Sequence, residues 1–295
     1  MDIASRLIIP LITPFKRDYS IDREEFKSHL ERLYREGVDA FFIASSTGEM
    51  DKLNIDEIGL LVEDVNDLDG DLDIYVGIYS SGSREALEKI KWLDERCEVD
   101  GYIIPTPPYF KYNDVELAMF YREILENVEN QVIIYVIPSL TGLLPSPQLF
   151  TDLLDRHENL TGVKITYDDA SYLESITRLV ETYPGFKVYV GSDVLTLPNL
   201  LIGGYGLIPG LGNVYPEPYI SLISSYLEGD LVEAVKWFRR ILRMERVFEA
   251  PYKFPAIVKA ALEILGLGID RRVRPPMNPV DKSYDEYIRS IFQGV

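Results

Sequence analysis

The feature that most constrains the fold of this chain is a strict alternation of short apolar runs with helical patterns along its first 214 residues. The apolar runs share a wealth of β-branched and aliphatic residues and cover 7–12, 39–45, 74–79, 101–105, 132–136, 160–166, 186–191 and 206–208. They are apolar on both faces, as the buried strands of a parallel sheet are. The helical patterns between them begin near residues 22, 55, 83, 114, 147, 170 and 194. Strands that alternate with helices in this way predict a parallel sheet.

Eight such units in about 210 residues favour a closed (β/α)8 barrel of the TIM type over an open doubly wound sheet. The first run is not followed by a Gly-x-Gly-x-x-Gly loop, which counts against a dinucleotide-binding fold. The pattern then becomes wholly helical, with helices predicted at about 218–228, 231–248, 254–265 and 284–292. We therefore predict an α/β fold. A TIM barrel covers residues 1–214, and a C-terminal helical extension over 215–295 packs on it in a single structural unit.

Charge and composition limit the partners of the chain. It carries 30 Lys and Arg against 48 Asp and Glu, for a net charge of −18, and such a surface repels nucleic acid and anionic membranes. The first residues lack the basic segment and long apolar core of a signal peptide. No apolar run reaches the roughly 18 residues that a membrane-spanning helix needs. We therefore expect a soluble, cytoplasmic protein.

Metal chemistry is not expected from the histidine and cysteine content. The single cysteine, Cys97, excludes an internal disulfide and a cysteine-cluster metal site, and one thiol fits a reducing compartment. Only His29 and His157 are present, each on a predicted helix among polar neighbours. They are far apart and lack the HExxH spacing of a zinc site.

The sixth run ends in a lysine that its apolar surroundings do not explain. Lys164 stands between Val163 and Ile165, at the end of the strand where a TIM barrel carries its active site. A lysine in a partly desolvated pocket loses its proton more easily and becomes a nucleophilic amine. Alternatively, its ammonium reaches solvent along the strand end or pairs with Asp168 or Asp169. Both interpretations are open for the lysine alone.

Other strand ends carry polar residues that would share the same mouth. Ser46, Thr47 and the exposed main-chain amide of Gly48 form a compact set of neutral donors suited to a carboxylate. A capped turn into the next helix explains the same residues equally well. Tyr135, near the end of the fifth run, is either a core aromatic with a satisfied hydroxyl or a proton shuttle close to the amine.

The seventh and eighth runs complete the predicted substrate-binding set with Gly191, Ser192, Asp193 and Ile208. Asp193 either caps the short helix after it or, with Ser192 and Thr166, holds sugar hydroxyls. Taken together, the strand ends place a lysine, a tyrosine and a carboxylate-binding loop around one mouth. That combination is rare by chance.

Short motifs follow one another in a recognisable order along essentially the whole chain. They are Pro10-Leu11-Ile12-Thr13-Pro14-Phe15, Ser46-Thr47-Gly48-Glu49, Tyr135-x-x-Pro138, Thr141-Gly142, Gly162-Val163-Lys164, Gly191-Ser192-Asp193 and Arg274-Pro275-Pro276. In these motifs and their spacing, the chain resembles the dihydrodipicolinate synthase / N-acetylneuraminate lyase family of Schiff-base aldolases.

The resemblance implies a role for each matching residue. Lys164 would form an imine with the ketone of pyruvate or of a 2-keto acid. Tyr135 would move the proton to and from the C4 oxygen during carbon–carbon cleavage. Ser46 and Thr47, with the Gly48 amide, would hold the α-keto carboxylate. The protonated imine is itself the electron sink, so no metal or organic cofactor is implied.

Departures from the family pattern narrow the range of expected substrates. Dihydrodipicolinate synthases carry an arginine two residues after the proline that matches Pro138, whereas this chain has Leu140, which argues against aspartate semialdehyde as acceptor. N-acetylneuraminate lyases usually carry an Asp-Glu pair near the end of the seventh strand. The Gly-Ser-Asp run at 191–193 instead resembles archaeal-type 2-keto-3-deoxygluconate aldolases. In those enzymes this segment and a threonine, here Thr166, contact the hydroxyl tail of the substrate.

Two further departures concern phosphate and the proton relay. The segment 250–256 offers Lys253 but no arginine and serine pair, so we favour an unphosphorylated substrate. Family members usually carry a Tyr-Tyr pair after the fourth strand, of which one tyrosine crosses a subunit interface. Here the pair is Tyr109-Phe110, so the relay lacks one hydroxyl unless Tyr109 or Tyr112 supplies it.

We therefore predict a class I aldolase that reversibly cleaves 2-keto-3-deoxygluconate, or a similar 2-keto-3-deoxy sugar acid, to pyruvate and glyceraldehyde. The alternatives are another pyruvate-dependent lyase or synthase of the family and a non-catalytic sugar-acid-binding protein. Intact Lys164, Tyr135 and Thr47 disfavour the last of these. The expected partners are the sugar acid, pyruvate and an aldehyde, without nucleic acid or membrane. The resemblance also implies a homotetramer, with Tyr109 and Phe110 as interface candidates.

Overall fold

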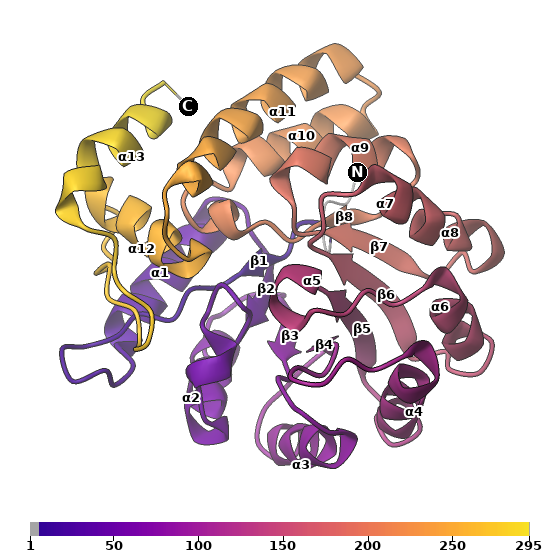
Figure 1. Ribbon diagram of the computed structural model, residues 1–295. Helices are drawn as coiled ribbons and strands as arrows, with labels where there is room; N and C mark the ends of the chain where they lie inside the picture. Colours follow the sequence, from indigo (N-terminus) through magenta and orange to yellow (C-terminus); the bar gives the residue numbers. More distant parts are fainter. Residues whose placement is uncertain (1–5, 295) are drawn as a thin grey trace. The chain divides into compact units, whose positions relative to one another are not determined.

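A computed structural model describes residues 6–294 of the chain (Figure 1). Its eight strands are parallel and follow the order β1-β2-β3-β4-β5-β6-β7-β8, with helices between them. The predicted fold class is confirmed: an α/β fold of the (β/α)8 TIM-barrel type, with helices after the last strand. Two compact units make up the chain. One comprises the residues up to Asp73 together with those from Pro209 onward, and the other comprises Ile74–Ile208.

The first unit combines the start of the chain with its end. Its strands are β1 (Ile9–Pro10) and β2 (Ala40–Ile43). Its α-helices are α1 (Arg23–Arg35), α2 (Ile55–Asn66), α10 (Glu217–Leu227), α11 (Leu231–Glu245), α12 (Phe254–Ile264) and α13 (Asp285–Phe292). Its 3-10 turns are η1 (Met50–Lys52), η3 (Gly210–Asn213), η4 (Arg246–Glu249) and η5 (Lys282–Tyr284). Helices α10 and α11 pack side by side (Figure 1). This unit joins the first strands to the C-terminal helices, so its boundaries differ from the predicted division at residue 214. The predicted division into a barrel and a helical extension stays a prediction.

Local sequence explains where the helices and strands of this unit begin and end. Asp22 caps α1 as predicted, since its carboxylate accepts a hydrogen bond of 3.3 Å from the Glu25 amide. Asn54 and Glu57 form a capping box at the start of α2. The strand β2 is shorter than the predicted run because Ala44 adopts a left-handed conformation, with φ of 52°, directly after Ile43.

The second unit contains six strands with their crossover helices, except that Asp73, the first residue of β3, belongs to the first unit. The strands are β3 (Asp73–Gly77), β4 (Gly101–Pro105), β5 (Gln131–Val136), β6 (Leu160–Ile165), β7 (Lys187–Val190) and β8 (Gly206–Leu207), and the helices are α3 (Ser83–Asp94), α4 (Asp114–Leu125), α5 (Pro138–Thr141), α6 (Pro147–Leu154), α7 (Ala170–Thr177), α8 (Leu179–Thr182), η2 (Asp193–Leu195) and α9 (Thr196–Leu201). The central strands are almost fully buried, as their apolar sequences predict.

One predicted helix of this unit is two helices in the structure. The pattern over 170–182 predicts a continuous helix, but α7 ends at Thr177 and α8 starts at Leu179. The Thr177 hydroxyl donates a hydrogen bond of 2.8 Å to the Leu173 carbonyl, one turn earlier. Such side-chain bonds to the preceding turn bend helices, which accounts for the interruption.

The register of the sheet aligns the residues that matter for chemistry. Tyr135 on β5 pairs with Lys164 on β6, and Lys164 pairs in turn with Tyr189 on β7. Parallel neighbours in register present their carboxyl ends at the same edge of the sheet. The lysine and the tyrosine therefore come from adjacent strands at one level.

Candidate active site

Lys164 is buried at the end of β6, with 2% of the residue exposed to solvent. Removal from water disfavours a charged ammonium, and this burial lowers the pKa of Lys164 from its ordinary 10.5 to about 7. At neutral pH, the Lys164 side chain is therefore an uncharged amine in about half of the molecules. The alternative in which the ammonium reaches solvent along the strand end does not fit this burial.

The two carboxylates considered as partners of Lys164 are engaged elsewhere. Asp168 accepts a short hydrogen bond from the Ser192 hydroxyl. Asp169 caps α7, since its carboxylate accepts a hydrogen bond of 2.8 Å from the Tyr172 amide. The low pKa of the lysine consequently agrees with desolvation as its main cause.

Tyr135 presents the face of its ring to the lysine. The Lys164 Nζ atom lies 4.1 Å from the ring centroid, and the Tyr135 hydroxyl accepts a hydrogen bond of 3.4 Å from the Thr166 hydroxyl. Tyr135 therefore has polar contacts beyond those of a core aromatic, and its role as a proton shuttle stays a prediction.

Gly191, directly after β7, lies close to the lysine side chain. A Cβ atom at this position would lie 2.3 Å from the Thr166 Oγ1 atom and 2.9 Å from the Lys164 Cε atom, and 3.5 Å from the Ile208 carbonyl oxygen. Any side chain here would displace one of its neighbours. The structure thus brings together five of the residues predicted from the sequence, namely Lys164, Tyr135, Thr166, Gly191 and Ile208.

Ser192 and Asp193 follow directly, and both are buried. The Ser192 hydroxyl donates a hydrogen bond to the Asp168 carboxylate. Asp168, which was not among the predicted substrate-binding residues, therefore contacts one of them. Asp193 is the first residue of η2, and no side chain caps this turn, so its interpretation as a helix cap is not supported. Its main-chain carbonyl accepts a hydrogen bond from Thr196.

The predicted carboxylate-binding loop lies in the first unit, between β2 and η1, and one part of the prediction is wrong. Gly48 is buried, not exposed, and its amide donates a hydrogen bond of 3.0 Å to the Ser45 hydroxyl. This amide is therefore already in use. Thr47 is also buried. Its main-chain N–H and its hydroxyl donate no hydrogen bond to any group within residues 6–294. Thr47, rather than Gly48, offers donors to a ligand.

Tyr109 and Phe110 lie on the surface of the second unit, after β4. Tyr109 is 90% exposed and has a left-handed backbone with φ of 83°. The two rings meet edge to face, with centroids 4.9 Å apart, and Phe110 contacts Tyr112 in the same manner at 6.2 Å. Such exposed aromatic rings suit a contact with another chain, and their role as an interface stays a prediction.

In the described part of the chain, no group of three or more His, Cys, Asp or Glu residues could hold a metal ion. His29 is buried, contrary to the expected polar surroundings, and its Nε2 atom lies 3.0 Å from the Asn213 Oδ1 atom. Burial lowers the pKa of His29 to about 3. None of the helices in residues 6–294 is both long and apolar enough to cross a membrane.

Comparison with known proteins decides the family. Residues 4–294 match the Dihydrodipicolinate synthetase family. The chain belongs to this family.

Relatives within the family are similar over nearly the full length. An uncharacterised DapA-like lyase of Pyrococcus abyssi is 32% identical over 270 residues, which cover 92% of this chain and 91% of the relative. YagE of Escherichia coli K12, provisionally named a 2-dehydro-3-deoxy-D-gluconate aldolase, is 26% identical over 97% of this chain and 95% of its own length.

Solved structures of the family share the fold. The crystal structure of YagE in complex with pyruvate has a TM-score of 0.92 and covers 97% of both chains at 26% identity. Dihydrodipicolinate synthase from Thermotoga maritima has a TM-score of 0.93 at 25% identity, and the match covers 99% of this chain and 98% of that one. This chain therefore has the same (β/α)8 fold as these two family members.

Two side-chain contacts of motif residues were not predicted from the sequence. Glu49 and Lys259 form a buried ion pair beside the Ser46–Gly48 loop. Thr106, at the end of β4, donates a hydrogen bond of 2.8 Å to Thr141. A sequence signal exists for the lysine, since Lys259 interrupts an otherwise apolar helix, as Lys164 interrupts an apolar strand.

Proposed function

We propose that this family member is a class I aldolase that reversibly cleaves 2-keto-3-deoxygluconate, or a similar 2-keto-3-deoxy sugar acid, to pyruvate and glyceraldehyde. The observation that carries the proposal is the buried Lys164 with its pKa of about 7, directly beside the Tyr135 ring. An unprotonated amine at neutral pH attacks ketones, whereas an ordinary lysine is almost fully charged.

The proposed reaction begins with the attack of the Lys164 amine on the C2 ketone. A proton from solvent leaves with the C2 oxygen as water, and a protonated imine joins Nζ to C2. The Tyr135 hydroxyl gives its own proton to solvent, and its oxygen then accepts the proton of the C4 hydroxyl while the C3–C4 bond breaks. The aldehyde departs, and the electron pair of that bond moves into the imine to give an enamine.

The second half restores the enzyme. Tyr135 gives this proton to C3 of the enamine, and water hydrolyses the resulting protonated imine to pyruvate and the free amine. The proton released in this hydrolysis returns to the Tyr135 oxygen. No metal or organic cofactor takes part in this proposal, because the protonated imine accepts the electron pair. General acid–base help of the kind assigned to Tyr135 typically accelerates a reaction by about 10² to 10⁴-fold.

The carboxylate of the 2-keto acid is assigned to the loop after β2. The main-chain N–H and the hydroxyl of Thr47 are its principal donors in this proposal, with Ser46 beside them. Neutral donors suit a carboxylate, since the iminium already supplies a positive charge close by. Gly48 does not offer its amide to the carboxylate in this proposal. A glycine is needed there because a Cβ atom would lie 2.6 Å from the Leu11 carbonyl oxygen.

Two features support a sugar acid over the substrate of a dihydrodipicolinate synthase. Leu140 on α5 is an exposed apolar residue, 53% accessible, and offers no charge to a second carboxylate. YagE, whose provisional name is that of a 2-dehydro-3-deoxy-D-gluconate aldolase, is similar over nearly the whole chain. The polar group of Thr166, Ser192, Asp168 and Asp193 is proposed to receive the hydroxyl tail of the sugar acid.

Borohydride trapping tests the mechanism. The protein is incubated with pyruvate and sodium borohydride, and the modified peptide is identified by mass spectrometry. We expect one stable adduct on Lys164, and its absence would contradict the imine mechanism. Turnover of 2-keto-3-deoxygluconate, of its 6-phosphate and of pyruvate with aspartate semialdehyde is then compared. A clear preference for either of the last two would overturn the proposed substrate.

A further inference from the structure

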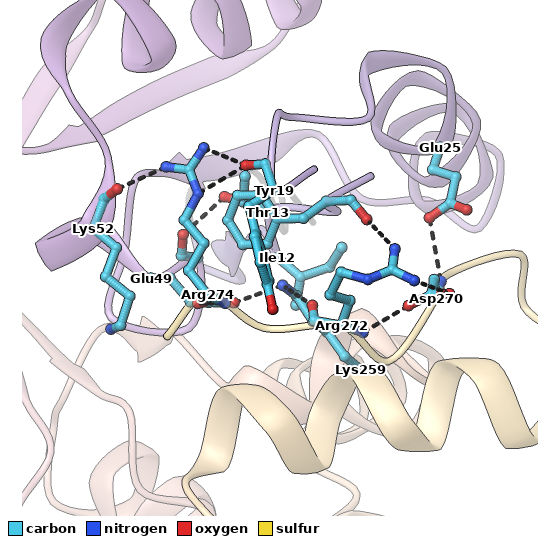
Figure 2. Close-up of polar contacts among 12 residues, drawn as sticks. Ile12, Thr13, Tyr19, Glu25, Glu49, Lys52, Lys259, Asp270, Arg272 and Arg274 are labelled. Atoms are coloured by element: carbon cyan, nitrogen blue, oxygen red, sulfur yellow. Dashed lines mark hydrogen bonds and ion pairs between the residues drawn. The ribbon is translucent and has the colours of Figure 1, made fainter. Parts of the chain in front are cut away.

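The first unit contains a fully buried ion pair outside the residues used so far. The Lys259 Nζ atom lies 2.6 Å from the Glu49 Oε1 atom, and neither side chain is exposed to solvent (Figure 2). Glu49 follows the Ser46–Gly48 loop directly, whereas Lys259 lies in the middle of the C-terminal helix α12. The pair therefore joins the proposed carboxylate-binding loop to a helix 210 residues away in sequence.

The second carboxylate oxygen of Glu49 also has a partner. Glu49 Oε2 accepts a hydrogen bond of 3.0 Å from the Arg274 amide (Figure 2). Arg274 itself is anchored by its guanidinium, which donates to the Tyr19 and Lys52 carbonyls and to the Glu57 carboxylate. Both oxygens of Glu49 thus point to partners that are fixed in place.

Lys259 has no apparent reason to be buried other than this contact. Its neighbours on α12 from Pro255 to Leu262 are all buried, and all are apolar. Besides Glu49, its ammonium donates a hydrogen bond of 2.9 Å to the Arg272 carbonyl and lies 4.2 Å from the centroid of the Phe15 ring. A buried charge is costly unless it is paired, and apolar side chains of similar volume often stabilise a core as well or better. A role beyond stability would explain the pair.

The backbone of Glu49 shows what the pair holds. Glu49 has a left-handed conformation with φ of 63° and ψ of 40°, which is rare for a residue other than glycine. Its amide donates to the Ser46 carbonyl at 3.3 Å, so its conformation closes the turn that contains Thr47. A strained residue of this kind persists only when its surroundings fix it, and the two contacts of its carboxylate do so.

The other amides of the loop are satisfied within the turn or beside it. Gly48 donates to the Ser45 hydroxyl, and Met50 donates at 3.0 Å to the Ser45 carbonyl. The Gly48 carbonyl accepts a hydrogen bond of 2.8 Å from the Thr13 hydroxyl. The loop is thereby fixed on each side of Thr47, whose own donors have no partner in the described chain.

We propose that Glu49 and Lys259 are positioning residues, which hold the loop of Ser46 and Thr47 in the conformation that binds the carboxylate of the 2-keto acid. This inference rests on the proposed function, because it needs a 2-keto acid that forms the imine with Lys164. It assigns to the C-terminal helix α12 a part in substrate affinity, exerted through one buried contact. Neither residue touches the substrate.

A purely structural ion pair differs from a positioning pair in what its loss changes. If the pair only stabilises the fold, its replacement lowers the melting temperature and leaves the affinity for pyruvate as it was. If the pair positions the loop, the affinity falls in variants that are fully folded. A misplacement of about 1 Å in a binding group can cost on the order of 10²-fold. The reaction of Lys164 at saturating pyruvate should change far less.

The experiment measures borohydride trapping at increasing pyruvate concentration in the whole protein. The variants are Glu49→Gln, which keeps the shape of the side chain, and the double variant Glu49→Gln/Lys259→Met, which leaves no unpaired buried charge. Asp64→Asn is the matched control. Asp64 is also a fully buried carboxylate of the first unit, paired with Arg23 and with Lys27 at 3.0 Å, but on α2 rather than beside the loop.

We expect the pyruvate concentration for half-maximal trapping to rise about 10- to 100-fold in both Glu49 variants. The trapped fraction at saturation should stay at the wild-type level, and Asp64→Asn should lose thermal stability without a change in half-saturation. Unchanged half-saturation in folded Glu49→Gln and in the double variant would overturn the positioning role and leave the proposed function intact. If wild-type protein forms no adduct, both proposals fail.

Discussion

Lys164 and Tyr135 occupy paired positions on the neighbouring strands β6 and β5, and the lysine Nζ lies 4.1 Å from the centre of the tyrosine ring. The sheet thus sets the distance between the proposed nucleophile and the proposed proton shuttle through main-chain hydrogen bonds, without a flexible loop. Catalytic groups on regular elements hold their geometry better than groups on loops. The strands supply the precision, and burial supplies the low pKa of the amine.

The rate of imine formation should follow the pKa of Lys164. Since burial lowers this pKa to about 7, the reactive amine should increase through pH 7 rather than near pH 10.5. We expect the rate of borohydride trapping at saturating pyruvate to rise about tenfold from pH 6 to pH 8 and then to level off. A rate that continues to climb up to pH 10 would show that the lysine keeps its ordinary pKa.

Tyr135→Phe should separate imine formation from cleavage. The variant keeps the ring beside Lys164 and removes the hydroxyl that accepts a hydrogen bond from Thr166. We expect the turnover of the sugar acid to fall by about 10² to 10⁴-fold, while the pyruvate adduct on Lys164 forms nearly as before. Equal losses in turnover and in pyruvate affinity would mean that Tyr135 only positions the substrate.

The sequence predicts much of the fold and the centre of the site because both follow local rules. Apolar runs and capping residues such as Asp22 mark the elements, and the order of alternation predicts the parallel sheet. A barrel places function at the carboxyl ends of its strands. Lys164 could therefore be recognised once the barrel placed it at the mouth, whereas the lysine alone fitted an ammonium in solvent or an ion pair equally.

What the sequence does not predict depends on contacts between distant segments or on the detail of a turn. The partner of Glu49 is Lys259, and no local pattern connects the two. Gly48 was expected to expose its amide, but the hydroxyl of Ser45 satisfies it within the turn. The break between α7 and α8 depends on the rotamer of Thr177, which composition and periodicity do not determine.

Gly191→Ala should disturb the lysine directly. The added Cβ would lie 2.3 Å from Thr166 Oγ1 and 2.9 Å from Lys164 Cε, both closer than real contacts allow. We expect imine formation to slow by about 10²-fold, because displacement of a reacting group by an ångström has a cost of that order. Gly185→Ala is the control: a Cβ at Gly185 would have nothing within 4 Å. Equal activity in both variants would show that the space around Lys164 adapts.

Lys164→Met should change how the stability of the protein depends on pH. The folded-state pKa of Lys164, about 7, lies below its ordinary value of 10.5, so between these values the unfolded chain binds more protons than the folded one. The free energy of unfolding of the wild type therefore rises with pH in this window, since the burial of a charged lysine costs most below pH 7 and nothing above pH 10.5.

Methionine occupies a similar volume and has no charge to lose. The variant should consequently be more stable than the wild type at pH 6, by a few kcal/mol at most. The advantage should shrink steadily as the pH rises to 9. Urea denaturation of both proteins at pH 6, 7, 8 and 9 measures this difference, and Lys259, whose pKa is lowered to about 8 by burial, contributes equally to both and cancels. A constant difference across the four pH values would mean that Lys164 is charged throughout in the folded protein, and the proposed nucleophile would lose its physical basis.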